Sequence, residues 1–370
     1  MSLIQQTHGS NGGVARRTGH AEQSARLKAM AVVGLGYWGP NWVRVITQLQ
    51  RANRVVCCDL SAARREQISR LYPDVTMVAS VEDVLSDPEV EAAVIATPVG
   101  SHYDMARRFL DAGKSVLVEK PLAMSLKQAE DLVRLSRRNQ RTLMVGHTFE
   151  YSAPVLKTRE LIESGELGDI LYISSVRVNL GLFQRDINVA WDLATHDISI
   201  ILMLLGQMPE SVSCQGQSHY RNNVEDVALL TLHFPGGVIA FIHVSWLDPH
   251  KIRRATIVGS RKMVVYDDTA LQEKIRIYDK GVTVQPHYST YGEFQLSYRY
   301  GDIQIPRIEE AEPLKVECEH FVDCIQSGAA PKTDGLNGLR VVSVLEAADI
   351  SLLNGGARVP VNQGALRWDQ

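Results

Sequence analysis

Short apolar runs alternate with helix-like stretches along the first 150 residues of the chain. Runs of valine, alanine, isoleucine and leucine are typical of buried parallel strands, and they occur at 29–33, 54–59, 75–78, 92–96, 115–118 and 143–145. Between these runs, apolar residues recur with the helical period at 38–49, 103–112 and 125–139. The alternation predicts the α/β class, with a doubly wound parallel sheet in the N-terminal part.

The pattern changes after about residue 150, where period-2 alternation becomes dominant. A helical stretch at 155–163 precedes alternating segments at 170–178, 211–219, 227–234, 238–245, 254–258 and 262–266. Helical patterns return at 191–205, 314–326 and 336–353. We therefore expect a nucleotide-binding domain at 28–148 and an α+β domain at 149–370. The second domain would have a large open mixed or antiparallel sheet, and its last helices could pack back on the first domain.

A glycine-rich turn joins the first predicted strand to the first helix. In this setting the GxGxxG spacing is a dinucleotide-binding fingerprint, because the glycines allow a tight turn, close approach of a pyrophosphate and close packing. Asp59 ends the next strand, where a carboxylate can bind ribose hydroxyls and repel a 2′-phosphate. This favours NAD over NADP, although Arg64 and Arg65 could soften the preference. The expected cofactor contacts here are Gly34, Leu35, Gly36, Tyr37, Trp38, Gly39 and Asp59.

Polar residues also follow the fourth and fifth strands, at the edge where parallel sheets hold ligands. Lys120 would point into the crevice and could assist proton transfer, unless it is a solvated surface lysine. The residues expected near the cofactor at this edge are Thr97, Pro98, His102, Glu119, Lys120 and Pro121.

Asp192 and His196 are spaced i and i+4 at the start of a helix that is apolar on nearly every side. His196 could act as a general base or acid, with Asp192 orienting it or binding substrate. Alternatively, Asp192 caps the helix and His196 is a core histidine. Farther along, four tyrosines occupy a stretch predicted to be irregular, where they could stack on a sugar or form a subunit interface. They are Tyr288, Tyr291, Tyr298 and Tyr300.

Composition narrows the possible partners and compartment. The formal net charge of −3 argues against nucleic acid as the main partner. Five cysteines form no CxxC pair and no metal-ligand cluster, which indicates a reducing cytoplasmic compartment and no metal. Residues 1–27 have no apolar region for a signal peptide or membrane span, and we expect a disordered extension there.

The combination of motifs resembles the glucose–fructose oxidoreductase / inositol dehydrogenase family (Gfo/Idh/MocA) over about residues 28–360. The motifs are Gly34-Leu35-Gly36-Tyr37-Trp38-Gly39, Ala96-Thr97-Pro98, Glu119-Lys120-Pro121 and Asp192-x-x-x-His196. The resemblance implies a Rossmann domain, an open sheet that lies against other subunits, and a homo-oligomer, a dimer or tetramer. It also implies a catalytic trio of Lys120, Asp192 and His196, and a cis Lys120–Pro121 bond.

Within the family, the segments at 146–151, 177–181 and 191–197 look similar to those of nucleotide-sugar 3-dehydrogenases, although Thr195 replaces their typical proline. This implies hydride transfer between NAD and the C3 hydroxyl of a UDP-linked N-acetylhexosaminuronate, or another nucleotide sugar. The predicted substrate contacts are Lys120, Arg177, Asn179, Trp191, Asp192 and His196. The alternatives are a dTDP-keto-deoxysugar 3-ketoreductase, an inositol or free-sugar dehydrogenase, and a non-catalytic NAD-binding sensor.

Overall fold

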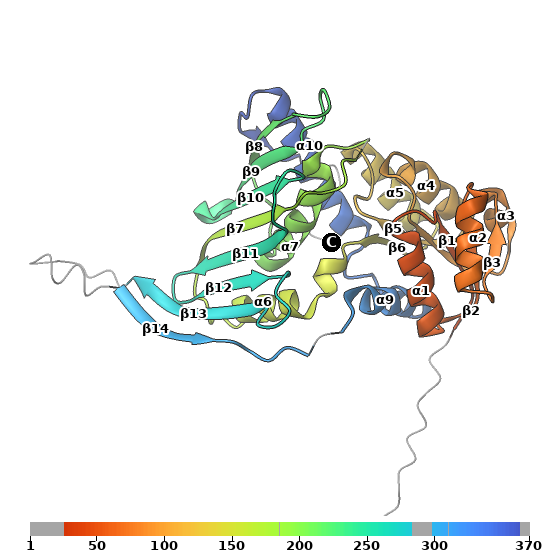
Figure 1. The fold of residues 1–370 in the computed structure, drawn as a ribbon, viewed down its shortest axis with the longest axis horizontal. Coiled ribbons are helices and arrows are strands. Elements are labelled where there is room, and N and C mark those ends of the chain that lie inside the picture. The colour runs from red at the N-terminus through yellow and green to blue at the C-terminus, as the bar shows by residue number, and fades with distance from the viewer. Residues whose placement is uncertain (1–25, 185, 283–297, 310, 363–370) are drawn as a thin grey trace, which may run out of the picture.

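The computed structural model describes residues 26–184, 186–282, 298–309 and 311–362. The chain builds two sheets that lie side by side with helices between them (Figure 1). The N-terminal half forms a six-stranded sheet, and the rest of the described chain forms a nine-stranded sheet with its own helices. Residues 1–25, most of the predicted N-terminal extension, lie outside the described residues.

The six-stranded sheet is parallel throughout and has the strand order β3-β2-β1-β4-β5-β6. This confirms the predicted doubly wound sheet. The first four strands and the helices among them are β1 (Leu27–Val33), α1 (Gly39–Leu49), β2 (Ala52–Cys58), α2 (Ala62–Leu71), β3 (Thr76–Val78), α3 (Val81–Ser86) and β4 (Val90–Ile95). The last elements are α4 (His102–Asp111), β5 (Ser115–Glu119), α5 (Leu126–Arg138) and β6 (Leu143–Gly146).

Both faces of this sheet are covered, which explains why its strands are continuous apolar runs rather than alternating ones. In β1, Ala29 and Ala31 pack into one core, while Met30 and Val32 pack into a second core on the opposite face. Helix starts are fixed locally, since the hydroxyl of Ser125 accepts a hydrogen bond from the Gln128 amide at the beginning of α5.

The nine-stranded sheet is mixed and has the order β14-β13-β12-β11-β7-β10-β9-β8-β15. Only β7 and β10 pair in parallel; the other pairs among the described residues are antiparallel. Its strands are β7 (Ile170–Val178), β8 (Ser211–Gln217), β9 (Val227–His233), β10 (Ile239–Ser245), β11 (Ile252–Gly259), β12 (Met263–Asp267), β13 (Ile275–Val282), β14 (Tyr298–Gln304) and β15 (Val359–Pro360).

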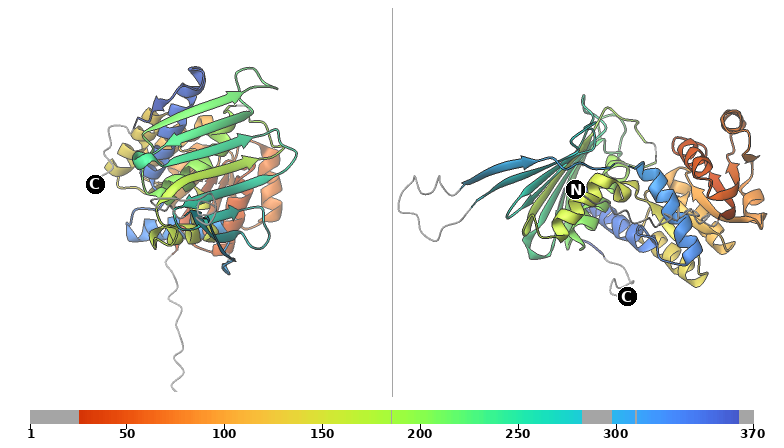
Figure 2. Two further views of the ribbon diagram at one scale, coloured as in Figure 1. Left: turned by 90° about the vertical axis from the view of Figure 1, so that its left-hand side faces the viewer. Right: turned by 90° about the horizontal axis from the view of Figure 1, so that it is seen from below.

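Helices cover one face of the nine-stranded sheet, and Figure 2 shows the other face open. The covering helices are α6 (Ala153–Glu163), α7 (Thr195–Leu205) and α10 (Gly335–Leu353). Helix α9 (Pro313–Ser327) packs on α1, so the C-terminal part of the chain returns to the six-stranded sheet. The open face exposes the apolar side chains of Tyr172, Leu229 and Phe241.

One predicted irregular stretch is in fact partly a strand. Tyr298 and Tyr300 belong to β14, which pairs with β13. The alternation of apolar and polar residues breaks off at Asp279 in β13 and at Asp302 in β14, so the sequence pattern did not reveal these strands. Tyr288 and Tyr291 lie outside the described residues.

Candidate active site

The glycine-rich turn between β1 and α1 has the shape that a dinucleotide requires. Gly34 has φ +95°, and a Cβ on it would lie 2.6 Å from the carbonyl oxygen of Ala96. A Cβ on Gly39 would lie 2.0 Å from the carbonyl oxygen of Gly34. Beside Gly36, by contrast, the nearest atom is the Arg64 guanidinium, 3.8 Å from a built Cβ. The turn therefore leaves room for a pyrophosphate at Gly36, next to the N-terminus of α1.

Asp59 lies directly after β2 and supports this turn. Its Oδ2 accepts a hydrogen bond from the Leu35 amide at 2.7 Å, and its Oδ1 accepts one from the Ser61 amide at 2.7 Å. The Arg64 guanidinium is 3.6 Å from Oδ2. Each carboxylate oxygen has two lone pairs, so Asp59 retains capacity for ribose hydroxyls. Its contact with the ribose stays a prediction.

Two residues expected to contact the cofactor have hydrogen-bond partners inside the protein, near the ends of the parallel strands. The buried carboxyl of Glu119 accepts a hydrogen bond from the Trp42 indole at 2.7 Å, and burial raises its pKa. The imidazole of His102 is also buried and lies between two carbonyl oxygens, 2.8 Å from that of Pro121 and 2.9 Å from that of Thr97. Both side chains are thus hydrogen-bonded inside the protein, and their contact with the cofactor stays a prediction.

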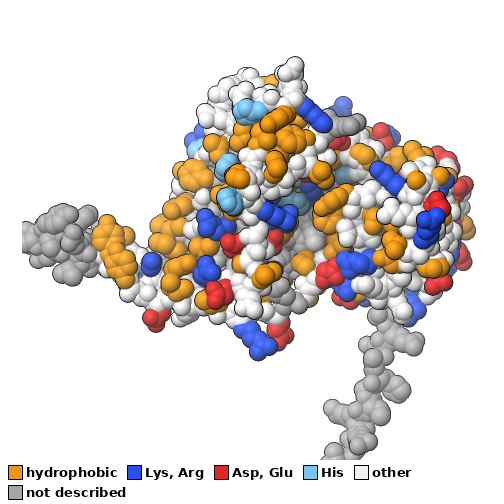
Figure 3. Space-filling model, viewed as in Figure 1, with side chains coloured by type: hydrophobic (Ala, Val, Ile, Leu, Met, Phe, Trp, Pro, Cys, Tyr) orange, Lys and Arg blue, Asp and Glu red, His pale blue; other side chains and the backbone are white. Residues whose placement is uncertain are grey.

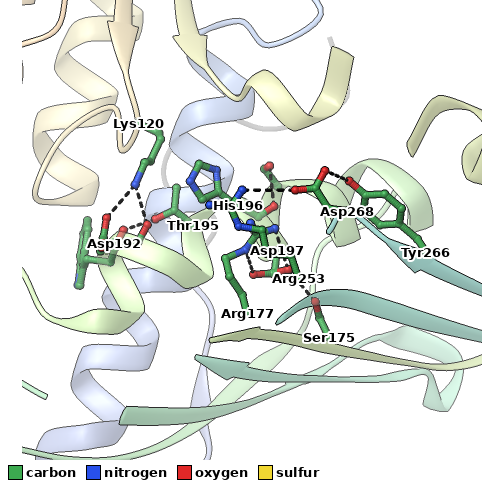
Figure 4. A network of polar contacts seen from close by, with 12 residues as sticks. Lys120, Ser175, Arg177, Asp192, Thr195, His196, Asp197, Arg253, Tyr266 and Asp268 are labelled. Carbon is green, nitrogen blue, oxygen red and sulfur yellow. Dashed lines mark hydrogen bonds and ion pairs between the residues drawn. The ribbon is translucent and has the colours of Figure 1, made fainter. Parts of the chain in front are cut away.

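Lys120 crosses from the six-stranded sheet to the second half of the molecule. Its Nζ donates to the Asp192 carbonyl oxygen at 2.7 Å and to Asp192 Oδ1 at 3.0 Å (Figure 4). Its peptide bond to Pro121 is cis, as the resemblance implied. The other carboxylate oxygen of Asp192, Oδ2, accepts from the Trp246 indole at 3.0 Å. Asp192 is thus held from both sides, with Lys120 facing the cofactor edge.

A π-helical turn, η3 (Ala190–Ala194), precedes α7 and carries Asp192. Such turns break the i to i+4 bonding of an α-helix and often occur at functional sites. The regular i, i+4 geometry expected for Asp192 and His196 therefore does not apply. Within the described structure, the Asp192 carboxylate is hydrogen-bonded to Lys120 and Trp246 rather than to His196.

His196 is buried close to several cations. Burial lowers its pKa well below the usual value, and Lys120, Arg177 and Arg253 lower it further. Its Nδ1 has no hydrogen-bond partner among the described residues. The ring meets Phe149 edge-on, with centroids 5.0 Å apart; Phe149 lies in the short helical turn η2 (Thr148–Tyr151). Burial and the neighbouring charges therefore favour the neutral form of the His196 imidazole.

Two predicted substrate contacts are engaged inside the protein. The buried Arg177 guanidinium pairs with Asp197 at 2.7 Å, and Ser175 donates to the same carboxylate at 2.6 Å. Arg177 also lies over the Phe149 ring, 4.6 Å from its centroid. The buried Trp191 indole donates to Asp349 of α10 at 2.6 Å. Buried carboxylates thus take up the polar groups of Arg177 and Trp191, and a contact of either residue with the substrate stays a prediction.

The remaining predicted contacts are placed as follows. Asn179 is half-buried just beyond β7, and its backbone N–H donates to the Ser245 backbone carbonyl at 3.2 Å. Thr97 is half-buried and Pro98 exposed, just beyond β4. Leu35 is buried in the turn, whereas Tyr37 and Trp38 are exposed. Their roles in binding stay predictions.

Sequence reasoning missed several residues of this network. Phe149 could have been found, because it closely follows the sixth strand, at the edge that holds ligands. Trp246 and Asp349 have no such signal, since they reach the site only through tertiary packing. Arg253 of β11 pairs with Asp268, which also accepts a hydrogen bond from Tyr266 (Figure 4).

The charges around the site mark it on the surface. Basic and histidine side chains lie along the boundary between the two halves in the space-filling view (Figure 3). No group of three histidine, cysteine or carboxylate side chains within the described residues could hold a metal ion. Among the helices of the described chain, none is long and apolar enough to cross a membrane.

Comparisons with known proteins agree with this architecture. Residues 28–147 match the model of the oxidoreductase family with an NAD-binding Rossmann fold, and residues 155–265 match the GFO/IDH/MocA C-terminal domain. The chain is 25% identical to the NAD-dependent scyllo-inositol 2-dehydrogenase of Bacillus subtilis, over 88% of this chain and 94% of that protein.

Two solved structures show the same fold at lower identity. The WlbA dehydrogenase of Bordetella pertussis, crystallised with NADH and UDP-GlcNAcA, superposes with a TM-score of 0.75 at 22% identity, covering 91% of this chain and 98% of that one. The UDP-N-acetylglucosamine 3-dehydrogenase GnnA of Acidithiobacillus ferrooxidans gives 0.73 at 21% identity, covering 88% and 98%.

Proposed function

Because the chain belongs to the Gfo/Idh/MocA family of NAD-binding oxidoreductases, we propose that it oxidises or reduces a secondary carbon of a sugar, at C3 of a nucleotide-linked sugar. The observation that carries the proposal is the Lys120–Asp192 pair beside a neutral His196. These groups meet where the fifth strand of the parallel sheet ends, next to the cofactor edge.

Each residue has a distinct part in the proposed reaction. NAD, held by the glycine turn and Asp59, supplies the hydride acceptor or donor. In the oxidative direction, His196 takes the hydroxyl proton, since its lowered pKa keeps it unprotonated near neutral pH. Lys120 donates a hydrogen bond to the same substrate oxygen, and Asp192 fixes the lysine. General acid–base assistance of this kind contributes about 10²- to 10⁴-fold in rate.

A second candidate is an inositol or free-sugar dehydrogenase. The observation that favours it is the match to scyllo-inositol 2-dehydrogenase, which extends over nearly the whole of both chains. A third candidate, a reductase of dTDP-linked 3-keto deoxysugars, would use the same residues with His196 returning the proton. All three share the hydride step and differ in what is attached to the reacting ring.

The test is a panel of substrates followed by NADH fluorescence. UDP-sugars, dTDP-sugars, inositols and free sugars are offered with NAD⁺ or NADP⁺, and dTDP-keto sugars are offered with NADH. We expect turnover of a nucleotide sugar with NAD. Turnover of an inositol without any nucleotide sugar would select the second candidate. Confirmed NAD binding without turnover of any compound in either direction would contradict the proposed enzyme.

We further propose that the open face of the nine-stranded sheet is covered by a second copy of the chain. Tyr172, Leu229 and Phe241 are exposed on neighbouring strands of this face, and contiguous apolar surface of this kind marks an interface. Light scattering should show a dimer or tetramer, and Phe241→Lys should shift it toward monomer. A monomeric wild type at working concentration would contradict the proposal.

A further inference from the structure

A series of three aromatic rings leads from the surface to the carboxylate that holds Lys120. Tyr220 meets Phe183 with ring centroids 5.5 Å apart at 67°, and Phe183 meets Trp246 at 5.5 Å and 55°. The Trp246 indole then donates to Asp192 Oδ2. Exposure falls along this series, from 73% at Tyr220 to 1% at Trp246. The outer ring is therefore open to a ligand, whereas the inner ring belongs to the active site.

The series is built on one buried residue, Asp226. Its carboxylate accepts hydrogen bonds from the backbone amides of His219, at 2.7 Å, and Tyr220, at 3.2 Å. Its carbonyl oxygen accepts the backbone amide of Trp246 at 2.9 Å. Asp226 thus fixes the loop that carries the outer ring and the strand end that carries the inner ring. Their separation is set by the fold rather than by a chance contact between side chains.

The loop that carries Phe183 is tied to the same place. The Gly181 amide donates to the Trp246 carbonyl at 3.0 Å, and the Arg221 guanidinium donates to the Gln184 carbonyl at 2.5 Å. This loop also exposes 76% of Leu180 and 70% of Leu182. Large exposed apolar side chains in two joined loops beside an active site indicate a ligand surface.

The chemistry of this surface selects a planar ring as its occupant. The exposed Tyr220 ring, which meets Phe183 edge-on, offers a stacking face, and bases stack on such faces regardless of their identity. Arg221, the next residue after Tyr220, brings a positive charge to the same rim. A nucleotide-linked sugar has both features, a base and a diphosphate, whereas a free polyol has neither.

We propose that Tyr220, Phe183 and Leu182 form the base subsite of this enzyme, with the sugar of the same substrate lying against Lys120 and Asp192. The inference rests on the proposed nucleotide-linked substrate. It adds the place where the nucleotide is recognised, at the outer end of the aromatic series. Removal of the Tyr220 ring should weaken nucleotide binding without touching the residues that move the proton.

The experiment measures binding of UDP and dTDP to the NAD-saturated protein by calorimetry, so that it does not depend on turnover. Tyr220→Ala should weaken diphosphate binding by about 5- to 100-fold, as expected for the loss of one base–aromatic stack. Tyr220→Phe keeps the ring and should bind like wild type. Tyr300→Ala removes an equally exposed tyrosine from β14 and is the matched control.

Kinetics with an active nucleotide sugar should then show a raised KM and an unchanged kcat in Tyr220→Ala. Undetectable binding of either diphosphate to wild type, or equal binding by wild type and Tyr220→Ala, would overturn the subsite even if the enzyme oxidises a sugar. Ring-dependent diphosphate binding supports the subsite even where the sugar panel is silent. Failure of the subsite and failure of the proposed reaction are thus distinguishable.

Discussion

Lys120 connects the two halves of the molecule through its hydrogen bonds. It extends from the end of β5, yet its ammonium donates both of its hydrogen bonds to described residues to Asp192, in the other half. Only about a tenth of its side chain is exposed, so its charge acts in a partly dehydrated setting. Its ammonium also lowers the pKa of His196.

Removing either proton-handling group should abolish most turnover while leaving cofactor binding intact. We expect Lys120→Ala and His196→Ala each to lower kcat by about 10²- to 10⁴-fold. NAD affinity, measured by fluorescence titration, should remain close to wild type because the glycine turn is untouched. Lys127→Ala, at an exposed position on α5, is the control. Wild-type turnover in both active-site variants would contradict the assigned roles.

The position of a residue could be predicted from the sequence where the residue follows a strand. The direction of its side chain could not be predicted where distant residues determine it. Lys120 follows a strand and does reach the second half of the molecule. Glu119, Arg177 and Trp191 were also placed near the site, but their side chains turn inward. Their partners are 77, 20 and 158 residues away along the chain, so no local pattern could reveal them.

At the scale of elements, the turn η3 depends on helix α10. The carboxylate of Asp349 in α10 accepts a hydrogen bond from the Trp191 indole at 2.6 Å and another from the Asn188 side-chain amide at 3.1 Å. The side-chain oxygen of Asn188 accepts a hydrogen bond from the Trp191 backbone amide at 3.1 Å. The backbone carbonyl oxygen of Asn188 accepts one from the Asp192 backbone amide, also at 3.1 Å. The turn is thus held by α10 through Trp191 and Asn188, and by Lys120 and Trp246 through the Asp192 carboxylate.

We expect Asp349→Leu to lower kcat by about 10- to 100-fold, since small displacements of positioned groups have effects of this size. KM and NAD affinity should change far less. Asp349→Asn retains one acceptor oxygen and should recover part of the loss. Glu346→Gln is the control, because Glu346 lies on the same helix and accepts the Leu126 amide instead. Equal losses in Asp349→Leu and Glu346→Gln would indicate general damage to α10.

Elements were predictable in proportion to their apolar content. The strands of the six-stranded sheet are apolar runs and were found, with ends shifted by a few residues. Helix α2 was missed because Ile68 is its one buried residue, and α3 was missed because it has only six residues. The π-helical form of η3 has no sequence signal, because it follows from the packing of Trp191 against α10.

For the molecule as a whole, stability should depend on a carboxyl buried where the C-terminal helices meet the six-stranded sheet. Glu150 in η2 accepts hydrogen bonds from the Asn337 side chain of α10, at 3.1 and 3.4 Å. Burial raises its pKa from 4.5 to about 7. The folded state therefore holds this proton more tightly than the unfolded state does, and stability falls as pH rises from about 4.5 to about 7.

Glu150→Gln should remove this dependence. Relative to wild type, the variant should gain up to about 3 kcal/mol in the free energy of unfolding at pH 8, and the gain should shrink to about 1 kcal/mol or less at pH 5. Urea unfolding at the two pH values measures it. Glu160→Gln changes an exposed carboxyl on α6 and should show no such gain. A Glu150→Gln gain that is the same at both pH values would contradict the buried-proton account.

The packing of α9 has a consequence for how the protein is made. Leu314, Phe321 and Val322 of this helix share a core with Val32 of β1 and Ile46 of α1. One side of the NAD-binding sheet is therefore completed by residues near the other end of the chain. A nascent chain on the ribosome cannot finish that sheet until translation has passed residue 322 and the helix has left the exit tunnel. Until then, the cofactor-binding half presents an apolar surface on which chaperones can act.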